Sequence, residues 1–203
     1  MTKAERAIET RERILTAACE VIADIGFESI SMRKVAERAG VSKALLHYHF
    51  DTREKLFAEA MTHSFAQTGK DTAADEGPVP ASVALARILR SMLPTDEELR
   101  QDWKLWQELW VRAQRDAAAR HLALDLYDQL HAWVGGAVER GIASGEFTDC
   151  DIAALSTLVL ALCDGLGIRL MLDDPRVDLA TARAVIWRTI APALGVPEAF
   201  PEI

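Results

Sequence analysis

Apolar residues recur at intervals of three and four along most of the chain, and no stretch alternates steadily between apolar and polar residues. The first spacing places side chains on one face of an α-helix, whereas alternation would indicate a β-strand. Glycine and proline residues interrupt the pattern, as they do where helices end. The pattern therefore predicts an all-α protein. The predicted helices are residues 10–25, 31–39, 42–49, a helix from Thr52, 81–93, 96–115, 117–144, 151–172 and 179–194.

Two segments lack the helical pattern. Residues 1–9 are charged without an apolar period and are expected to form a frayed arm. Residues 69–80, GKDTAADEGPVP, are small, polar and rich in glycine and proline, which is typical of a linker. The sequence thus predicts a small N-terminal helical part followed by a larger C-terminal one.

Residues 31–56 have the pattern of a helix-turn-helix. The apolar residues of VAERA repeat at helical spacing, and Gly40 follows them as a residue type that accepts the left-handed conformation closing a helix. Ser42 then has a side chain suited to capping a second helix. In a helix-turn-helix the second helix lies in the major groove of DNA, with its N-terminal residues at the base edges.

The same segment resembles the DNA-binding domain of the TetR (tetracycline-repressor) family. The resemblance covers residues 10–60 and rests on GF before the motif, MRKVAERAGVSKALLHYHF within it and the helix that opens at Thr52. It implies a homodimeric repressor that binds a palindromic double-stranded DNA operator and leaves it when a small-molecule effector binds. The chain departs from the family pattern at Ala44, Leu45, His47 and Arg53, so the resemblance does not give the operator sequence.

The candidate DNA contacts follow from this placement. Residues at the start of the second helix of the motif face the bases, whereas hydroxyl and cationic side chains around it hold phosphates and fix the register. Residues 1–55 are predicted to be the DNA-binding domain, and residues 56–203 the all-helical domain for effector binding and dimerisation. The predicted DNA-binding residues are Ser31, Arg33, Ser42, Lys43, Ala44, Leu45, His47, Tyr48 and Arg53.

The net charge of −8 argues against nucleic-acid binding until it is divided along the chain. Residues 1–55 hold ten Lys and Arg against nine Asp and Glu, while residues 56–203 hold thirteen against twenty-two. The acidic excess therefore belongs to the C-terminal part. Because DNA binding depends on the local field at the contacting face, the charge of the N-terminal part permits it.

The last two predicted helices carry dense apolar faces. Two such antiparallel helices can form a four-helix bundle with the same pair from a second copy, as homodimers do. Packing against the rest of their own domain is the alternative. The predicted dimer-interface residues are Leu155, Leu158, Leu162, Leu166, Val185, Ile186 and Ile190.

Three tryptophans on one predicted helix are the most unusual feature of the C-terminal part. They are spaced three and four apart and therefore share one face. They either form the wall of a ligand pocket, where indole rings can bind cations such as quaternary ammonium groups, or belong to the core. The run WKLWQELWVRA also resembles the choline-responsive betaine-repressor branch of the family, which implies a choline-like effector. The predicted effector pocket is Met92, Trp103, Trp106, Trp110, Tyr127, His131 and Asp164.

Other chemistry has little support. The three cysteines are widely spaced, which favours small buried side chains and leaves a Cys150–Cys163 redox pair as the alternative. No metal site, cofactor or catalytic cluster is predicted, so the chain is not expected to be an enzyme. No apolar run is expected to reach the roughly 20 residues that span a bilayer, and the N-terminus is too polar for a secretory signal. A cytoplasmic protein without membrane association is predicted.

The sequence leaves one alternative function. In that alternative the helix-turn-helix still binds DNA, but the C-terminal domain binds a protein partner rather than a small ligand. A fully packed interior around the three tryptophans would favour it.

Overall fold

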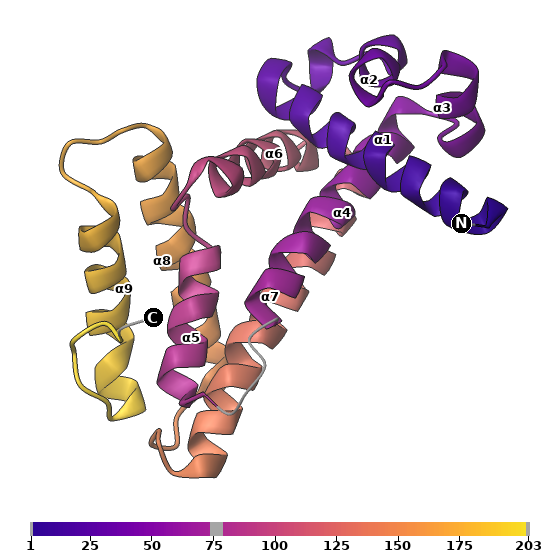
Figure 1. The fold of residues 1–203 in the computed structure, drawn as a ribbon. Coiled ribbons are helices and arrows are strands. Elements are labelled where there is room, and N and C mark those ends of the chain that lie inside the picture. The colour runs from indigo at the N-terminus through magenta and orange to yellow at the C-terminus, as the bar shows by residue number, and fades with distance from the viewer. Residues whose placement is uncertain (1, 74–78, 202–203) are drawn as a thin grey trace. The chain divides into compact units, whose positions relative to one another are not determined.

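The computed structural model describes residues 2–73 and 79–201, and all regular secondary structure over these residues is helical, which confirms the all-α prediction (Figure 1). From the helix-turn-helix onward, the predicted helix ends differ from the observed ones by at most two residues, apart from the linker. The helices are α1 (Lys3–Ile25), a 3-10 turn (Phe27–Ser29), α2 (Met32–Ala39), α3 (Lys43–His49), α4 (Arg53–Ala73), α5 (Ala81–Ser91), α6 (Glu97–Ala113), α7 (Ala117–Ser144), α8 (Ile152–Met171) and α9 (Leu179–Leu194).

Helix α1 begins at Lys3, seven residues earlier than predicted. Thr2 and Glu5 form a capping box: Thr2 Oγ1 accepts the Glu5 N–H at 3.2 Å, and Glu5 Oε2 accepts the Thr2 N–H at 2.8 Å. This reciprocal pairing satisfies donors at the helix N-terminus. The predicted frayed arm was therefore wrong, because a local cap supports the helix where an apolar face is missing.

The helix-turn-helix is present where it was predicted. Ser31 Oγ accepts the Lys34 N–H at 3.3 Å, and Ser42 Oγ accepts the Leu45 N–H at 3.1 Å, so each serine caps the helix that follows it. Gly40 ends α2 at φ +64° and ψ 35°, a left-handed conformation that glycine adopts without strain. Helix α2 packs against both α1 and α3 (Figure 1).

Helix α4 continues to Ala73 and so includes the first five residues of the predicted linker. Gly69 lowers helix stability by about 1 kcal/mol relative to alanine, but adding a turn to an existing helix is much easier than starting one. Residues 74–78 of the predicted linker lie outside the described residues. Val79 and Pro80 are not helical, and α5 begins directly after them.

The chain packs as two compact units, residues 1–70 with 101–124 and residues 71–100 with 125–203. The first unit holds the helix-turn-helix, nearly all of α4 and most of α6. The second holds α5, α8, α9 and most of α7. Helix α6, which carries the three tryptophans, therefore belongs to the same unit as the N-terminal helices. The functional division after residue 55 stays a prediction.

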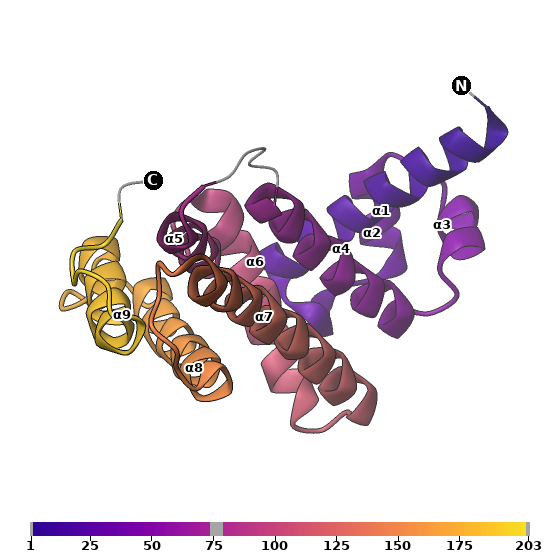
Figure 2. The same ribbon diagram turned by 90° about the horizontal axis from the view of Figure 1, so that it is seen from below.

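The second unit has a large apolar core to which α5, α7, α8 and α9 contribute. Helices α8 and α9 lie side by side in it (Figure 2). Trp187 of α9 is fully buried, and its Nε1 donates to the Pro197 carbonyl at 2.9 Å. This bond satisfies the one polar atom of the indole and ties the segment after α9 to the core.

Helix α8 is long and apolar enough to cross a membrane, judged by length and composition alone, and no other helix among the described residues is. The expectation that no apolar run reaches this length was wrong. Only 33% of its apolar window is buried in the structure. The other residues of this window are half-buried or exposed, and Leu158 and Ile168 are exposed apolar residues among them.

Glu146 closes the N-terminus of α5 from the segment between α7 and α8. Its carboxylate accepts the backbone N–H of Ala81 at 2.6 Å, the N–H of Ser82 at 2.9 Å and the Ser82 hydroxyl. Pro80, the N-cap residue, offers no side-chain acceptor, so Glu146 takes that role. Burial by itself raises the pKa of Glu146, but these hydrogen bonds outweigh it, and the net pKa is lowered.

We expect Glu146→Gln to destabilise the fold by about 1–2 kcal/mol at neutral pH, because the amide replaces one acceptor with a donor. A lowered folded-state pKa means that the carboxylate stabilises the fold above its unfolded pKa, and that this effect is lost as the pH falls through the folded pKa. Thermal melts from neutral to acid pH should therefore converge for the two proteins. Glu139→Gln, which changes an exposed carboxylate of α7, is the control. A stability difference that does not change with pH would contradict this role.

Candidate nucleic-acid interface and effector site

Helix α3 presents one exposed face. Leu46 and Phe50 are fully buried and fix the helix to the core of the first unit. Tyr48 leaves 79% of its surface exposed, more than a folded protein usually leaves to so large an aromatic ring. The predicted base-contacting residues therefore surround the buried anchor and remain accessible. The exposed ones on the helix are Lys43, Ala44, Leu45, His47 and Tyr48.

The predicted phosphate contacts differ in how strongly other groups hold them. Arg33 Nε pairs with Glu37 Oε1 at 2.8 Å on the surface of α2. The Arg53 guanidinium lies 4.4 Å from the ring centroid of Phe27, and its Nη1 donates to a backbone carbonyl at 3.5 Å. Lys43 forms no ion pair or hydrogen bond with any side chain that the structure describes. Lys43 is thus the predicted cation with the most freedom to reach a phosphate.

Helix α6 contacts the turn that precedes the helix-turn-helix. Glu108 Oε2 accepts the Phe27 N–H at 3.1 Å. The Arg112 guanidinium carbon lies 3.7 Å from the ring centroid of Phe27 and 4.9 Å from that of Phe57. We call Phe27, Glu108 and Arg112 the Phe27 clamp. It was not predicted, because 81 residues separate Glu108 from Phe27 and no local pattern marks the pair.

The three tryptophans of α6 form an aromatic cluster in the first unit. The ring centroids of Trp103 and Trp110 are 5.8 Å apart, and those of Trp106 and Trp110 are 6.0 Å apart. The ring centroids of Phe65 of α4 and Trp106 are 6.3 Å apart. Trp103 is buried, whereas Trp106 and Trp110 are half-buried. One ring is therefore a core residue, and the other two keep accessible surface.

Two predicted pocket residues, Tyr127 and Asp164, meet in the second unit. The Tyr127 hydroxyl donates to Asp164 Oδ2 at 2.7 Å. Burial raises the pKa of Asp164, and the hydrogen bond from Tyr127 lowers it by less. No cationic side chain among the described ones pairs with this carboxylate. A desolvated carboxylate without a counter-charge favours binding of a cation.

The remaining predicted pocket residues have different surroundings. Met92 is buried in the core of the second unit, and His131 is half-buried. The tryptophans belong to the first unit, and the Tyr127–Asp164 pair belongs to the second. The pocket as one assembled set stays a prediction.

The predicted dimer-interface residues fall into two groups. Leu155, Ile186 and Ile190 are buried in the core of their own unit, so they offer no surface to a second copy. Helical spacing alone did not indicate which apolar faces the chain would cover by itself. The accessible members are the exposed Leu158 and Val185 and the half-buried Leu162 and Leu166.

Helix α8 carries a continuous exposed apolar surface that the prediction only partly identified. Its residues are spaced four and three apart, so they share one face, and none is charged. A Cβ added at Gly165 would meet no atom within 4 Å, which means that the surface is open at its middle. We call it the α8 stripe, and it consists of the α8 residues Ala154, Leu158, Ala161, Gly165 and Ile168 and the C-cap residue Leu172.

The thiols are poorly suited to redox sensing. Burial raises the pKa of Cys19 to about 12 and raises that of Cys163 strongly. Burial and two flanking aspartates also raise the pKa of Cys150. Since the thiolate is the reactive form, these shifts argue against a Cys150–Cys163 pair. In the described part of the chain, no three His, Cys, Asp or Glu side chains are grouped so that they could hold a metal ion.

Comparison with known protein families accounts for both parts of the chain. Residues 14–60 match the bacterial regulatory proteins of the tetR family, and residues 82–195 match the C-terminal domain of BetI-type transcriptional repressors. Together with the fold, these matches define a helix-turn-helix regulator of transcription. The chain belongs to the TetR family, and its C-terminal domain is of the BetI type.

Similar proteins extend over nearly the whole chain. The transcriptional regulator PksA of Bacillus subtilis is 30% identical over 188 residues, which cover 89% of this chain and 87% of PksA. BetI of Agrobacterium fabrum is 26% identical over 180 residues, which cover 87% of this chain and 84% of BetI. A regulator from Saccharomonospora viridis, solved in complex with choline, has a TM-score of 0.79 at 28% identity and covers 91% of this chain and 96% of its own. The protein is thus a DNA-binding transcriptional regulator.

Proposed function

We propose that this regulator is a homodimeric repressor that a small organic cation releases from a palindromic operator. The observation that supports the cation is Asp164, a largely buried carboxylate whose described partner is the Tyr127 hydroxyl. Dimerisation, operator symmetry and effector class are the parts that go beyond family membership.

DNA recognition is assigned to α3. Its exposed residues enter the major groove, where His47 and Tyr48 are placed to reach base edges or the backbone and Lys43 binds a phosphate. Leu45 can contact a thymine methyl group but cannot donate or accept a hydrogen bond. In a dimer the two recognition helices meet half-sites one helical turn, about 34–36 Å, apart.

Dimerisation is assigned to the α8 stripe together with the exposed face of α9 at Val185. The stripe is apolar, free of charge and exposed, and monomeric soluble proteins rarely leave large surfaces of this kind uncovered. Ala161 and Gly165 are one turn apart and small, so a helix from a second copy can approach closely. The result is a four-helix bundle of α8 and α9 from both copies.

The effector site is assigned to Asp164 and Tyr127. Asp164 provides the charge that attracts a cation. Tyr127, its hydrogen-bond partner, and Trp133, which packs against the same core, are aromatic residues of this unit whose ring faces can bind an ammonium group. The choline bound to the Saccharomonospora viridis regulator supports a quaternary ammonium compound of similar size. When the effector binds preferentially to a state in which the two DNA-binding domains are misaligned, it lowers the affinity for the operator. By reciprocity, DNA lowers the affinity for the effector.

A location in the cytoplasm follows from this proposed function, because a DNA-binding regulator acts where the DNA is. The apolar composition of α8 is then explained by dimerisation rather than by a bilayer.

The test is operator binding by fluorescence anisotropy. The operator is first selected from random double-stranded DNA with the wild-type protein. We expect Lys43→Ala to weaken binding about equally for all sequences and to lower the salt slope by about two, because the dimer loses one phosphate contact from each protomer. Arg53→Ala should have a smaller effect, because its guanidinium already stacks on Phe27. Lys104→Ala of α6 is the control. If neither Lys43 nor Arg53 affects binding, the assignment of α3 fails.

The effector is tested in the same assay with choline as the probe and 3,3-dimethylbutan-1-ol, its neutral analogue of the same shape, as the control. Release by choline alone supports a cation site. Release by neither compound, with operator binding intact, contradicts a choline-like effector and favours the alternative in which the C-terminal domain binds a protein partner.

A further inference from the structure

We propose that Glu108 and Arg112 of α6 are positioning residues for DNA recognition, because they hold the turn from which the helix-turn-helix begins. The proposal rests on the proposed role of α3 in the major groove and does not depend on the effector. Neither residue is among the predicted DNA contacts. Both act through Phe27.

Glu108 binds the backbone at the junction of α1 and the turn. Gly26 adopts φ +74° and ψ 159°, and a Cβ added there would lie 3.0 Å from Glu108 Oε1. The carboxylate therefore occupies the space that the missing side chain leaves, and its other oxygen accepts the Phe27 N–H at 3.1 Å. A side chain of α6 thus satisfies a backbone donor that the N-terminal helices leave open.

Arg112 holds the ring of the same residue. Its side chain is only 13% exposed, and its Nη2 pairs with Asp116 Oδ2 at 2.9 Å. Its Nε is buried without an acceptor among the described residues, so the two phenylalanine rings and Asp116 fix the guanidinium. A flat guanidinium stacks on an aromatic ring in a way that an ammonium group cannot reproduce.

Helix α6 has a second attachment nearer its start. The Asp102 carboxylate accepts the hydroxyl of Ser64 and, at 3.1 Å, that of Thr68, both on α4. The ring of Phe57, also on α4, packs edge-on against Phe27 with centroids 4.8 Å apart. The turn is therefore enclosed by α4 and α6 together, and a displacement of α6 within this unit must move Phe27 or break the Phe27 clamp.

Phe27 is coupled to the recognition helix through a short path. It is 1% exposed and stands four residues before Ser31, the cap of α2, which packs directly against α3. Base contacts require side chains held close to one geometry, whereas contacts of Lys43 with phosphates tolerate small shifts. Loss of the Phe27 clamp should therefore lower sequence preference more than general affinity for DNA.

The experiment compares Glu108→Ala with Glu108→Gln and Arg112→Ala with Arg112→Lys. Affinity is measured by anisotropy for the operator selected with wild-type protein and for a scrambled DNA of equal length. We expect Glu108→Ala and Arg112→Ala to weaken operator binding roughly tenfold, with unchanged binding to scrambled DNA and an unchanged salt slope. Glu108→Gln keeps an acceptor for the Phe27 N–H and should retain most of the operator affinity that Glu108→Ala loses. Arg112→Lys should not, because it keeps the charge but loses the flat stack.

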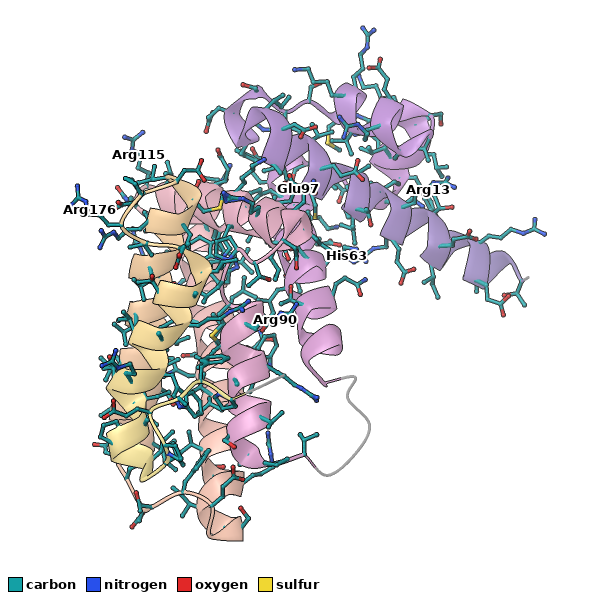
Figure 3. The ribbon with its side chains drawn as sticks, turned by 60° about the vertical axis from the view of Figure 1, so that its left-hand side comes forward. Arg13, His63, Arg90, Glu97, Arg115 and Arg176 are labelled. Carbon is teal, nitrogen blue, oxygen red and sulfur yellow. The ribbon has the colours of Figure 1, made fainter. Side chains whose placement is uncertain are left out.

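Arg115→Ala is the matched control, since Arg115 carries the same charge near the same end of α6 and projects away from the ribbon (Figure 3). Circular dichroism and the sedimentation coefficient report whether each variant keeps its fold and oligomeric state. If Arg112→Ala fails to fold, the Glu108 pair decides the outcome.

Equal losses on operator and scrambled DNA would overturn the proposal, because they would indicate general destabilisation. Wild-type operator affinity in Glu108→Ala would overturn it as well. Both results leave the proposed function standing, whereas failure of the wild-type protein to enrich any sequence would count against the proposed function itself.

Discussion

Gly165→Arg is expected to leave the chain folded but to make it monomeric, and to lower operator affinity roughly a hundredfold or more. Gly165 lies at the middle of the α8 stripe, where it is exposed and a Cβ meets no atom within 4 Å, so a side chain can start from this position without a clash in the single chain. Replacing a helical glycine also raises helix stability by about 0.5–1 kcal/mol. In a dimer the same side chain would place a charge in an apolar interface, which is strongly unfavourable unless it is paired.

Sedimentation equilibrium gives the mass, and anisotropy with the selected operator gives the affinity. The large effect on DNA arises because a monomer binds one half-site and loses the effective concentration that links it to the other. Ala132→Arg, which adds the same charge to an exposed position of α7, is the control and should behave as wild type. If the Gly165→Arg protein has the mass of two chains and unchanged operator affinity, the α8 stripe is not part of the dimer interface.

Asp164→Asn is expected to abolish the response to choline and to raise the melting temperature of the unliganded protein near neutral pH. Asparagine keeps an acceptor for the Tyr127 hydroxyl, which donates at 2.7 Å, but removes a desolvated charge. Because burial raises the pKa of Asp164 above its unfolded value, the carboxyl favours the folded state when protonated, and this contribution is lost as the pH rises through the folded pKa. The stability gained by the variant should therefore grow from acid to neutral pH.

The wild-type protein should bind choline more weakly as the pH falls through the raised pKa of Asp164, because a proton then competes with the cation. Melting temperature against choline concentration at several pH values measures this. Asp128→Asn, an exposed carboxylate of α7, is the control and should keep the choline response. A choline-induced shift of equal size in Asp164→Asn would place the cation elsewhere.

The local features of the fold could be predicted from sequence because their causes are local. Ser31, Gly40 and Ser42 set the ends of α2 and α3 through caps and a left-handed turn, and each interaction spans only a few residues. The capping box of Thr2 and Glu5 is equally local and was missed because the segment lacks apolar periodicity. A rule based on caps as well as periodicity would have found it.

The features that depend on tertiary packing could not be predicted in the same way. Ile186 and Ile190 lie on an apolar helix face, and spacing alone cannot distinguish a face covered by the chain itself from one left for a second copy. The Phe27 clamp joins residues 81 positions apart and depends on how α6 packs. Asp164 was identified as a pocket candidate, but its burial without a counter-charge became evident only with its neighbours.

The exposed apolar face of α8 also bears on how much of this regulator a cell must contain. Two-thirds of the residues in the apolar window of α8 are not fully buried in a single chain, and exposed apolar side chains such as Leu158 and Ile168 can be bound by chaperones and proteases. The proposed dimer would cover these side chains, and dimerisation rises with concentration by mass action. The dissociation constant of the dimer would then set a lower limit on copy number, below which newly made chains are degraded before they meet.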